Sequence, residues 1–396
     1  MRIAIFTDTF LPQINGVVRT TVTTANGLVA RGHKVAIFTM DVRKIKVEAA
    51  HSSQPNELDD RVQVHTFTSL TSPWFKDIQL RIPTLAAPLS AARRFRPDLI
   101  DSKTVFGIGW DAVMVARLLK CPLVGTHNGF LAEYLGNVRL DFSTMKNLMR
   151  QYLGFYYNRC DAVTVSCRAL GKELLDHGLK CPVQVISNAL DLRQLAVHGS
   201  KEGLRKKYKL TKPTLVHVGR LVAQKSIDGL LHAFAQLLKL GVDAHLIIIG
   251  DGRERPRLEA LAHKLAILDS VTFTGLLQDK ELWEHIAAGD IFVSASTTEA
   301  QALAFFEAMA LGLPAIGVRA GGVPEYVQHE KNGLLVAPDD PEALAQAMRH
   351  LIEDAVLRES YGACAKEGVK AYDAEAVLDK IETLYRGLEK AGRLIV

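Results

Sequence analysis

Short apolar runs alternate along the chain with stretches in which apolar residues recur at a helical period. In the first half, runs typical of buried strands lie at residues 2–6, 34–39, 62–66, 99–101, 123–126, 162–166 and 183–186. A helical period that ends at Ala30 and closes at Arg31-Gly32 joins the first two runs. Strands that alternate with helices in this way build a doubly wound parallel sheet. The first half therefore predicts one Rossmann-like domain.

A second series of strand-like runs follows at residues 214–218, 246–249, 271–273, 291–294, 315–318 and 334–336. The polar and basic stretch from Asp191 to Lys212 separates the two series and is the predicted hinge. We place a first domain at residues 1–195 and a second at residues 196–375. Ligands of parallel sheets bind at the carboxyl ends of the strands. The pattern thus predicts an α/β fold in which two Rossmann-like domains face each other across a central cleft.

Composition adds the class and compartment. The chain has 396 residues, 48% hydrophobic and 23% charged, and this is about twice the length that one core supports. No apolar run approaches the roughly 18 residues that cross a bilayer, and Asp8 interrupts the first run too early for a signal peptide. The five cysteines form no C-x-x-C pair, which disfavours a disulfide framework or a zinc site. We expect a cytoplasmic protein with reduced thiols.

The net charge of +5 is unevenly distributed. Residues 1–197 hold 24 basic and 16 acidic side chains, whereas the remainder holds 24 and 27. A basic first half favours an anionic partner, either a membrane surface or a charged substrate. A basic face that is merely solvated explains the same count equally well.

Several common enzyme signatures are absent from the sequence. The first strand is not followed by G-x-G-x-x-G, and the chain contains no G-x-x-x-x-G-K-[ST], G-x-S-x-G, H-E-x-x-H or D-x-D. The sequence therefore disfavours a dehydrogenase, a P-loop kinase, a serine hydrolase and a metal-bridged sugar transferase.

The segment from Ser296 to Pro314 carries the most specific pattern. It predicts a strand, a short loop with Glu299, and a helix with Glu307 near its first turns. The free N–H groups and positive dipole end of such a helix suit a phosphate. Two carboxylates that flank this point can accept hydrogen bonds from paired sugar hydroxyls. The alternative is a capping glutamate followed by a solvated helix glutamate.

The E-x7-E spacing of Glu299 and Glu307, within TEAQALAFFEAMALGLP, closely resembles the motif of retaining glycosyltransferase family 4, whose members have the two-domain GT-B fold. Three other segments resemble that family in the same order and spacing: the glycine loop at residues 14–18, the segment Gly125-Thr126-His127, and the basic loop at residues 219–226. The likeness runs from about residue 1 to residue 371. It implies a final helix, residues 376–396, that crosses back to the first domain.

The resemblance assigns roles by position. Glu299 would contact the transferred hexose, Glu307 would bind the ribose hydroxyls, and Arg220 and Lys225 would hold the diphosphate. His127 would line the sugar site. The remaining implied donor contacts lie in loops and at a helix start: Gly16, Gly219, Gly250, Gln301, Ala302 and Leu303.

Each of these residues also has a plain structural interpretation. Arg220 and Lys225 can be two solvated bases at a helix start, and Gly16 can serve a simple turn. His127 can be structural, and Gly250 can belong to an ordinary β-to-α turn. Ala302 departs from the family pattern, because many members have glycine there; alanine restricts φ and puts the loop geometry and the donor contacts in question.

The resemblance implies transfer with retention of configuration, without a metal or other cofactor, from UDP-glucose or GDP-mannose. The opening segment looks most like members that glycosylate membrane lipids, such as diacylglycerol glucosyltransferases and phosphatidylinositol mannosyltransferases. We therefore expect a membrane glycerolipid as acceptor and a peripheral enzyme on the inner face of the cell membrane, with no nucleic-acid partner. The oligomeric state is left open.

Basic residues of the first domain are the predicted acceptor or membrane surface: Arg93, Arg94, Arg96, Lys146 and Arg150. The last two lie beside an apolar stripe with helical spacing: Met145, Leu148, Met149, Tyr152, Leu153 and Tyr156. A basic amphipathic helix can lie on an anionic bilayer. A core-facing stripe is the favoured alternative.

Three other functions stay open. One is a GDP-mannose-dependent mannosyltransferase that acts on an envelope polysaccharide or another soluble acceptor. The more remote two are a nucleotide-sugar 2-epimerase, which shares two facing Rossmann-like domains, and a pseudoenzyme that binds a nucleotide sugar without transferring it.

Overall fold

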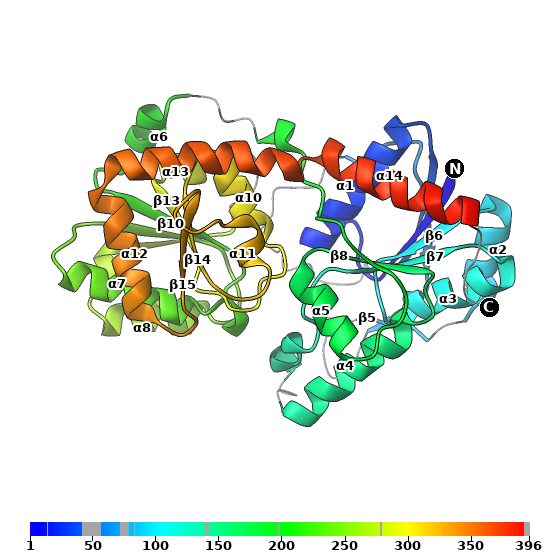
Figure 1. The fold of residues 1–396 in the computed structure, drawn as a ribbon. Coiled ribbons are helices and arrows are strands. Elements are labelled where there is room, and N and C mark those ends of the chain that lie inside the picture. Colours follow the sequence, from blue (N-terminus) through cyan, green and yellow to red (C-terminus); the bar gives the residue numbers. More distant parts are fainter. Residues whose placement is uncertain are drawn as a thin grey trace.

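The computed structural model describes residues 1–13, 15–41, 57–71, 79–82, 84–138, 142–195, 197, 199–277 and 279–391. Two α/β lobes make up this part of the chain (Figure 1). Ile14 of the predicted glycine loop and residues 392–396 of the predicted last helix lie outside the described residues.

The first lobe is built on a parallel sheet of seven strands in the order β3-β2-β1-β6-β7-β8-β9. Its strands are β1 (Arg2–Thr7), β2 (Lys34–Met40), β3 (Gln63–Phe67), β6 (Leu99–Ser102), β7 (Leu123–His127), β8 (Ala162–Val165) and β9 (Val183–Val185). Its helices are α1 (Gly16–Ala30), α2 (Ala86–Phe95), α3 (Gly107–Leu119), η1 (Glu133–Val138), α4 (Ser143–Tyr157) and α5 (Arg168–Asp176). The short antiparallel strands β4 (Leu70–Thr71) and β5 (Gln79–Leu80) pair with each other.

The second lobe is built on a parallel sheet of six strands in the order β12-β11-β10-β13-β14-β15. Its strands are β10 (Thr214–Val218), β11 (His245–Ile249), β12 (Val271–Gly275), β13 (Ile291–Val293), β14 (Ala315–Val318) and β15 (Gly333–Val336). Its helices are α6 (Lys201–Lys207), η3 (Ala223–Lys225), α7 (Ile227–Lys239), α8 (Arg255–Lys264), η4 (Leu268–Ser270), α9 (Asp279–Ala288), α10 (Leu303–Ala310), α11 (Val323–Tyr326), α12 (Pro341–Glu353) and α13 (Ala355–Gly368).

The apolar runs become strands because helices cover both faces of each sheet, so that a strand needs apolar side chains on both sides. In the first lobe, Phe6 and Phe38 stack with ring centroids 4.5 Å apart. In the second, Phe292 packs edge-on against Phe305 at 4.7 Å. Each strand of the two large sheets lies within two residues of a predicted run. The predicted fold of two Rossmann-like domains is confirmed.

The predicted hinge contains two short helical segments. Residues 192–194 form a turn of 3-10 helix, η2 (Leu192–Gln194), and α6 follows before β10. Lys207 and Tyr208, at the end of α6, both donate to the Glu284 carboxylate of α9, the latter over 2.7 Å. Helix α6 is therefore held against the second lobe.

The last described helix returns to the first lobe. After η5 (Val369–Tyr372), α14 (Ala374–Ala391) runs beside α1 over that lobe (Figure 1). A Cβ at Gly27 would lie 2.2 Å from a methyl carbon of Leu378, so glycine permits the two helices to meet closely. Arg31 at the end of α1 pairs with Glu375 at 2.8 Å and Asp379 at 2.7 Å. The domain boundaries at residues 195 and 375 stay predictions.

Candidate active site

Two loops of the second lobe meet at the carboxyl ends of the neighbouring strands β10 and β11. The N–H of Gly219 donates to the last carbonyl of β11 over 3.0 Å, and the N–H of Leu221 donates to the Asp251 carbonyl over 2.9 Å. Gly252 permits this approach, because a Cβ there would lie 2.5 Å from the Leu221 carbonyl oxygen. The structure thus places Gly219 and Gly250 at one edge of the sheet.

Lys225 and Glu299 form an ion pair beside this loop. Lys225 ends η3, Glu299 lies in the loop after β13, and Nζ is 2.6 Å from Oε1. Burial raises the pKa of the Glu299 carboxyl, but the Lys225 ammonium and a hydrogen bond from Ser296 outweigh it, so that its pKa lies below the usual value. Arg220 is exposed, and its guanidinium pairs with no residue that the structure describes. One cation thus holds a carboxylate while a second remains available to an anion.

Glu307 lies on α10 and meets a residue that the sequence did not suggest. Its Oε1 accepts a hydrogen bond from Nη1 of Arg19, which belongs to α1 of the first lobe. Both side chains are buried, at 4% and 3% exposure. The only signal in the sequence was an arginine among the apolar and threonine residues of a helix expected to be buried. Glu307 is therefore not the solvated helix glutamate of the alternative interpretation.

The start of α10 faces the first lobe. A Cβ at Gly16 would lie 3.8 Å from Cδ1 of Leu303, and Oε1 of Gln301 accepts from the N–H of Asn188 over 2.6 Å. Ala302 precedes the helix with φ −81° and ψ 112°, which any L-residue adopts without strain. Alanine in place of the family's glycine therefore does not strain this loop.

His127 ends β7 in the first lobe and is 1% exposed. Burial lowers its pKa to about 4, so the imidazole is neutral at physiological pH. Its ring packs edge-on against Tyr157 at 5.4 Å, and Nε2 has no hydrogen-bond partner among the described residues. A neutral imidazole with one unused nitrogen can donate to, or accept from, a sugar hydroxyl.

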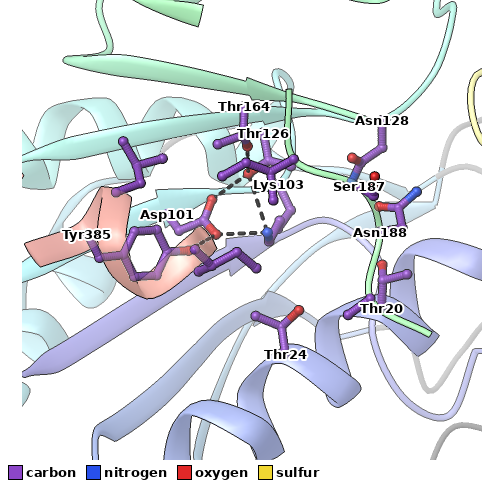
Figure 2. A pocket seen from close by; sticks show the side chains of 14 residues that line it. Thr20, Thr24, Asp101, Lys103, Thr126, Asn128, Thr164, Ser187, Asn188 and Tyr385 are labelled. Atoms are coloured by element: carbon purple, nitrogen blue, oxygen red, sulfur yellow. Dashed lines mark hydrogen bonds and ion pairs between the residues drawn. The ribbon is translucent and has the colours of Figure 1, made fainter. Parts of the chain in front are cut away.

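A polar pocket lies next to His127 at the ends of β6, β7 and β8 (Figure 2). At its floor Asp101 accepts from Thr126 Oγ1 at 2.7 Å and from the Tyr385 hydroxyl of α14 at 2.5 Å, and it pairs with Lys103 Nζ at 2.8 Å. The cavity volume is about 30 Å³, enough for one or two waters. This cluster was missed by the sequence analysis, because Tyr385 joins it from 284 positions away.

His217 was also missed. It lies within β10, 1% exposed, and Nδ1 forms a hydrogen bond of 2.9 Å with the Val293 carbonyl. Burial lowers its pKa to about 4. Nε2 would be 3.3 Å from a Cβ at Gly219, so the imidazole lies directly beneath the donor loop. A histidine inside an apolar strand run was its only signal.

The predicted surface cations differ in whether they form ion pairs within the first lobe. Arg93, Arg94 and Arg96, at the end of α2, are exposed. Lys146 and Arg150 of α4 instead pair with Glu133 at 2.6 Å and 2.7 Å. Their charge is thus partly compensated within the lobe.

The apolar stripe of α4 divides between core and surface. Leu153 and Tyr156 are fully buried, in agreement with the alternative of a core-facing stripe, whereas Leu148 is 57% exposed. Phe142, which precedes the helix, and Phe155 are also more than half exposed. Among the described residues no helix is long and apolar enough to cross a membrane.

The structure describes no cluster of three or more His, Cys, Asp or Glu side chains suited to a metal ion. Independence from metals stays a prediction. Of the predicted site residues, Gly16 lies next to Leu303 at the start of α10, and Lys225 pairs with Glu299 in the loop before that helix. Gly219 and Gly250 lie at the carboxyl ends of β10 and β11, and His127 ends β7 of the first sheet.

In the comparison with known proteins, each lobe matches a separate protein-family model. Residues 14–194 match Glycosyltransferase Family 4, and residues 200–368 match Glycosyl transferases group 1. The first match runs from the start of α1 to the end of η2, and the second runs from α6 to the end of α13.

Similar proteins include two transferases and a synthase. A sulfoquinovosyl transferase of Arabidopsis thaliana is 29% identical over 85% of this chain, a region that spans 66% of that enzyme. The alpha-monoglucosyldiacylglycerol synthase of Streptococcus pneumoniae is 29% identical over 80% of this chain and 70% of its own length. A GDP-mannose-dependent alpha-mannosyltransferase of Mycobacterium tuberculosis is 28% identical over 96% of this chain and 95% of its own length.

Among solved structures, the sucrose-phosphate synthase of Thermosynechococcus elongatus superposes with a TM-score of 0.79, at 22% identity, over 99% of this chain and all of that one. This likeness confirms the GT-B arrangement of the lobes. Because both lobes match glycosyltransferase families in the expected order, the chain belongs to the GT-B glycosyltransferases of family 4 and is a hexosyltransferase.

Proposed function

We propose that this hexosyltransferase moves glucose or mannose from a nucleoside diphosphate sugar to a membrane glycerolipid, with retention of the anomeric configuration. The observation that carries the proposal is the Lys225–Glu299 ion pair of 2.6 Å at the end of the second-lobe sheet, with the exposed Arg220, which pairs with none of the described residues, in the preceding loop. Nucleotide sugars are the donors of this family, and the choice between UDP-glucose and GDP-mannose belongs to the proposal.

Arg220 and Lys225 are suited to stabilise the negative charge of the leaving group. Departure of a nucleoside diphosphate builds negative charge on phosphate oxygens, and fixed donors stabilise that charge without reorganising. Arg220 offers a planar guanidinium that can bind two oxygens at once. Lys225 adds a point charge held in place by Glu299. The N–H groups at the start of α10 contribute partial positive charge on the same side.

Glu299 serves better as a positioning group for the hexose than as a nucleophile. Its Oε1 is engaged by Lys225, and its other oxygen can accept a hydrogen bond from a sugar hydroxyl. We therefore place the transfer on one face of the sugar. The bond from the anomeric carbon to the phosphate oxygen breaks, the acceptor oxygen bonds to the same face, and its proton passes to the departing phosphate.

The acceptor side is the first lobe. Phe106 and Phe142 precede α3 and α4, and together with Leu148 they expose apolar side chains on this lobe. The exposed arginines at residues 93, 94 and 96 lie where α2 leads into β6, at the amino ends of the strands, and add positive charge to the lobe. Exposed apolar groups and cations of this kind suit an anionic membrane surface. The diacylglycerol in the name of the pneumococcal relative supports a lipid acceptor.

A second candidate is a GDP-mannose-dependent mannosyltransferase with another acceptor. The mycobacterial relative supports it, since that enzyme matches over almost the full length of both chains. The two candidates differ in donor base, sugar and acceptor, while the second-lobe site serves either.

A donor-by-acceptor transfer screen with mass-spectrometric readout tests the proposal. UDP-glucose and GDP-mannose are each offered with diacylglycerol and phosphatidylinositol in neutral and in anionic vesicles, and with a soluble mannoside. We expect one hexose to be added to a vesicle lipid, with more product and more pelleted protein in anionic vesicles at low salt. Transfer only to the soluble mannoside would support the second candidate. Conversion of a nucleotide sugar to its epimer, or binding without any turnover, would contradict both.

A further inference from the structure

Arg19 joins the two lobes at the residue that is proposed to bind ribose. It lies on the second turn of α1, next to buried threonines, and its side chain is 4% exposed. Nη1 donates to Oε1 of Glu307. Nη2 is equally buried but has no hydrogen-bond partner among the described residues. One half of a buried guanidinium therefore holds Glu307, and the other half is unsatisfied.

An unsatisfied donor of this kind is costly. A buried polar group without a partner loses its hydration and gains nothing in return, and the loss is larger for a charged group. Such groups are rare in folded proteins and mark positions where a water, an ion or a ligand completes the contacts. Nη2 of Arg19 thus points to an oxygen acceptor that the protein alone does not supply.

We infer that Arg19 is a donor-site residue contributed by the first lobe, whose free Nη2 binds an oxygen of the nucleotide ribose while Nη1 holds Glu307 in position. The inference rests on the proposed function, because it takes Glu307 as the ribose-binding carboxylate. A carboxylate has lone pairs for several donors, so Glu307 can accept from Arg19 and from a ribose hydroxyl together. Arg19 and Glu307 then bind the same sugar ring from opposite lobes.

The surrounding contacts place this pair within a larger interface between the lobes. Gln301, two residues after Glu299, accepts from the Asn188 N–H at 2.6 Å. Glu325 of α11 accepts from the Arg168 N–H of α5 at 2.6 Å. Arg19 reaches Glu307 only while the lobes are held together in this way. The proposed ribose site therefore takes one residue from each lobe.

The test is a double-mutant cycle on nucleotide binding by calorimetry, with UDP and GDP as probes. Arg19→Met removes the guanidinium, Glu307→Gln removes the carboxylate charge, and the double variant leaves neither charge unpaired. We expect Arg19→Met to weaken the Kd about 10- to 100-fold, the range for a lost hydrogen bond to a charged group. The loss in the double variant is expected to be smaller than the sum of the two single losses, because Arg19 and Glu307 contact each other.

Two further variants separate a binding role from a folding role. Arg19→Lys keeps the ion pair with Glu307 and hence the fold, but it loses the planar pair of amino groups; we expect about tenfold weaker binding. Arg31→Met, at the far end of the same helix, removes ion pairs only to α14 and is expected to bind as the unmodified protein does. Millimolar guanidinium is expected to restore part of the binding lost in Arg19→Ala, which a purely structural role would not permit.

Unchanged or tighter UDP and GDP binding in Arg19→Lys, alongside normal binding by the unmodified protein, would overturn the inference and leave the proposed function standing. Tighter binding would show that Arg19 competes with ribose for Glu307. Failure of the unmodified protein to bind either nucleotide would instead overturn the proposed function, and the inference with it.

Discussion

Lys225 carries two tasks in the proposed site, since it holds Glu299 and faces the leaving group. Its Nζ lies 2.6 Å from the carboxylate, and it is the chief influence that keeps the pKa of Glu299 below its usual value against the effect of burial. One side chain thus sets both the charge of the hexose-positioning group and the field at the diphosphate.

Lys225→Met therefore lowers turnover about 100-fold or more, as the removal of a single transition-state donor does. Without the ammonium, burial raises the pKa of Glu299, so the remaining activity is lost at a higher pH than in the unmodified protein as the solution is acidified. Steady-state release of nucleoside diphosphate, measured across pH, checks both effects. Lys172→Met is the matched control, because Lys172 pairs with Asp176 on the exposed face of α5. Equal kcat in the two variants would remove Lys225 from the mechanism.

The site residues that the sequence revealed differ from those it concealed in how far apart their partners lie. Glu299 and Glu307 stand eight positions apart in one motif, so a single segment displays both. Arg19 meets Glu307 across 288 positions, and Tyr385 meets Asp101 across 284. Each of these residues alone is an ordinary arginine, tyrosine or aspartate. Only the packing of the lobes and of α14 gives them a role.

The positions of the strands could be predicted from the sequence, whereas the contacts that the helices make could not. A strand that is covered on both faces must be apolar throughout, and that requirement leaves a run of five or so residues that can be read directly. β4 and β5, with two residues each, are too short to leave such a run. The predicted hinge is polar and basic, but nothing in its composition showed that α6 contacts α9, since that contact depends on Glu284.

Helix α14 is anchored to the first lobe by a buried hydrogen bond as well as by surface ion pairs. The Tyr385 hydroxyl donates to Asp101 Oδ2 at 2.5 Å, and both buried residues line the pocket of Figure 2. The same carboxylate binds Lys103 and Thr126 next to His127. A helix from the end of the chain therefore supports the edge of the sheet on which the sugar site is proposed.

Tyr385→Phe is expected to reduce the free energy of unfolding by about 1–3 kcal/mol, because one acceptor position of a buried carboxylate loses its donor. Chemical denaturation followed by circular dichroism measures the change. Thr383→Ala on the same helix is the control, since the exposed Thr383 hydroxyl donates to the Asp379 carbonyl within α14. A loss no greater than that of the control would show that the α1 contacts alone hold α14.

Net charge is distributed unevenly between the two lobes of the molecule. The basic first half becomes the lobe with the exposed arginines and apolar residues, and the acidic second half becomes the lobe with Arg220 and Lys225. The interface between the lobes collects the buried ion pair of Arg19 with Glu307 and the contacts of Gln301. The proposed donor site thus lies mainly on one lobe, and Arg19 joins it from the other.

The proposed one-face mechanism transfers a hexose to an acceptor with its anomeric configuration retained. The direct measurement is the configuration of the product made from UDP-glucose or GDP-mannose, both α-linked donors, read from the one-bond carbon–proton coupling at the anomeric centre by NMR. We expect an α-linked hexose, formed by the unmodified protein and at least about 100-fold more slowly by Lys225→Met. A β-linked product would contradict it.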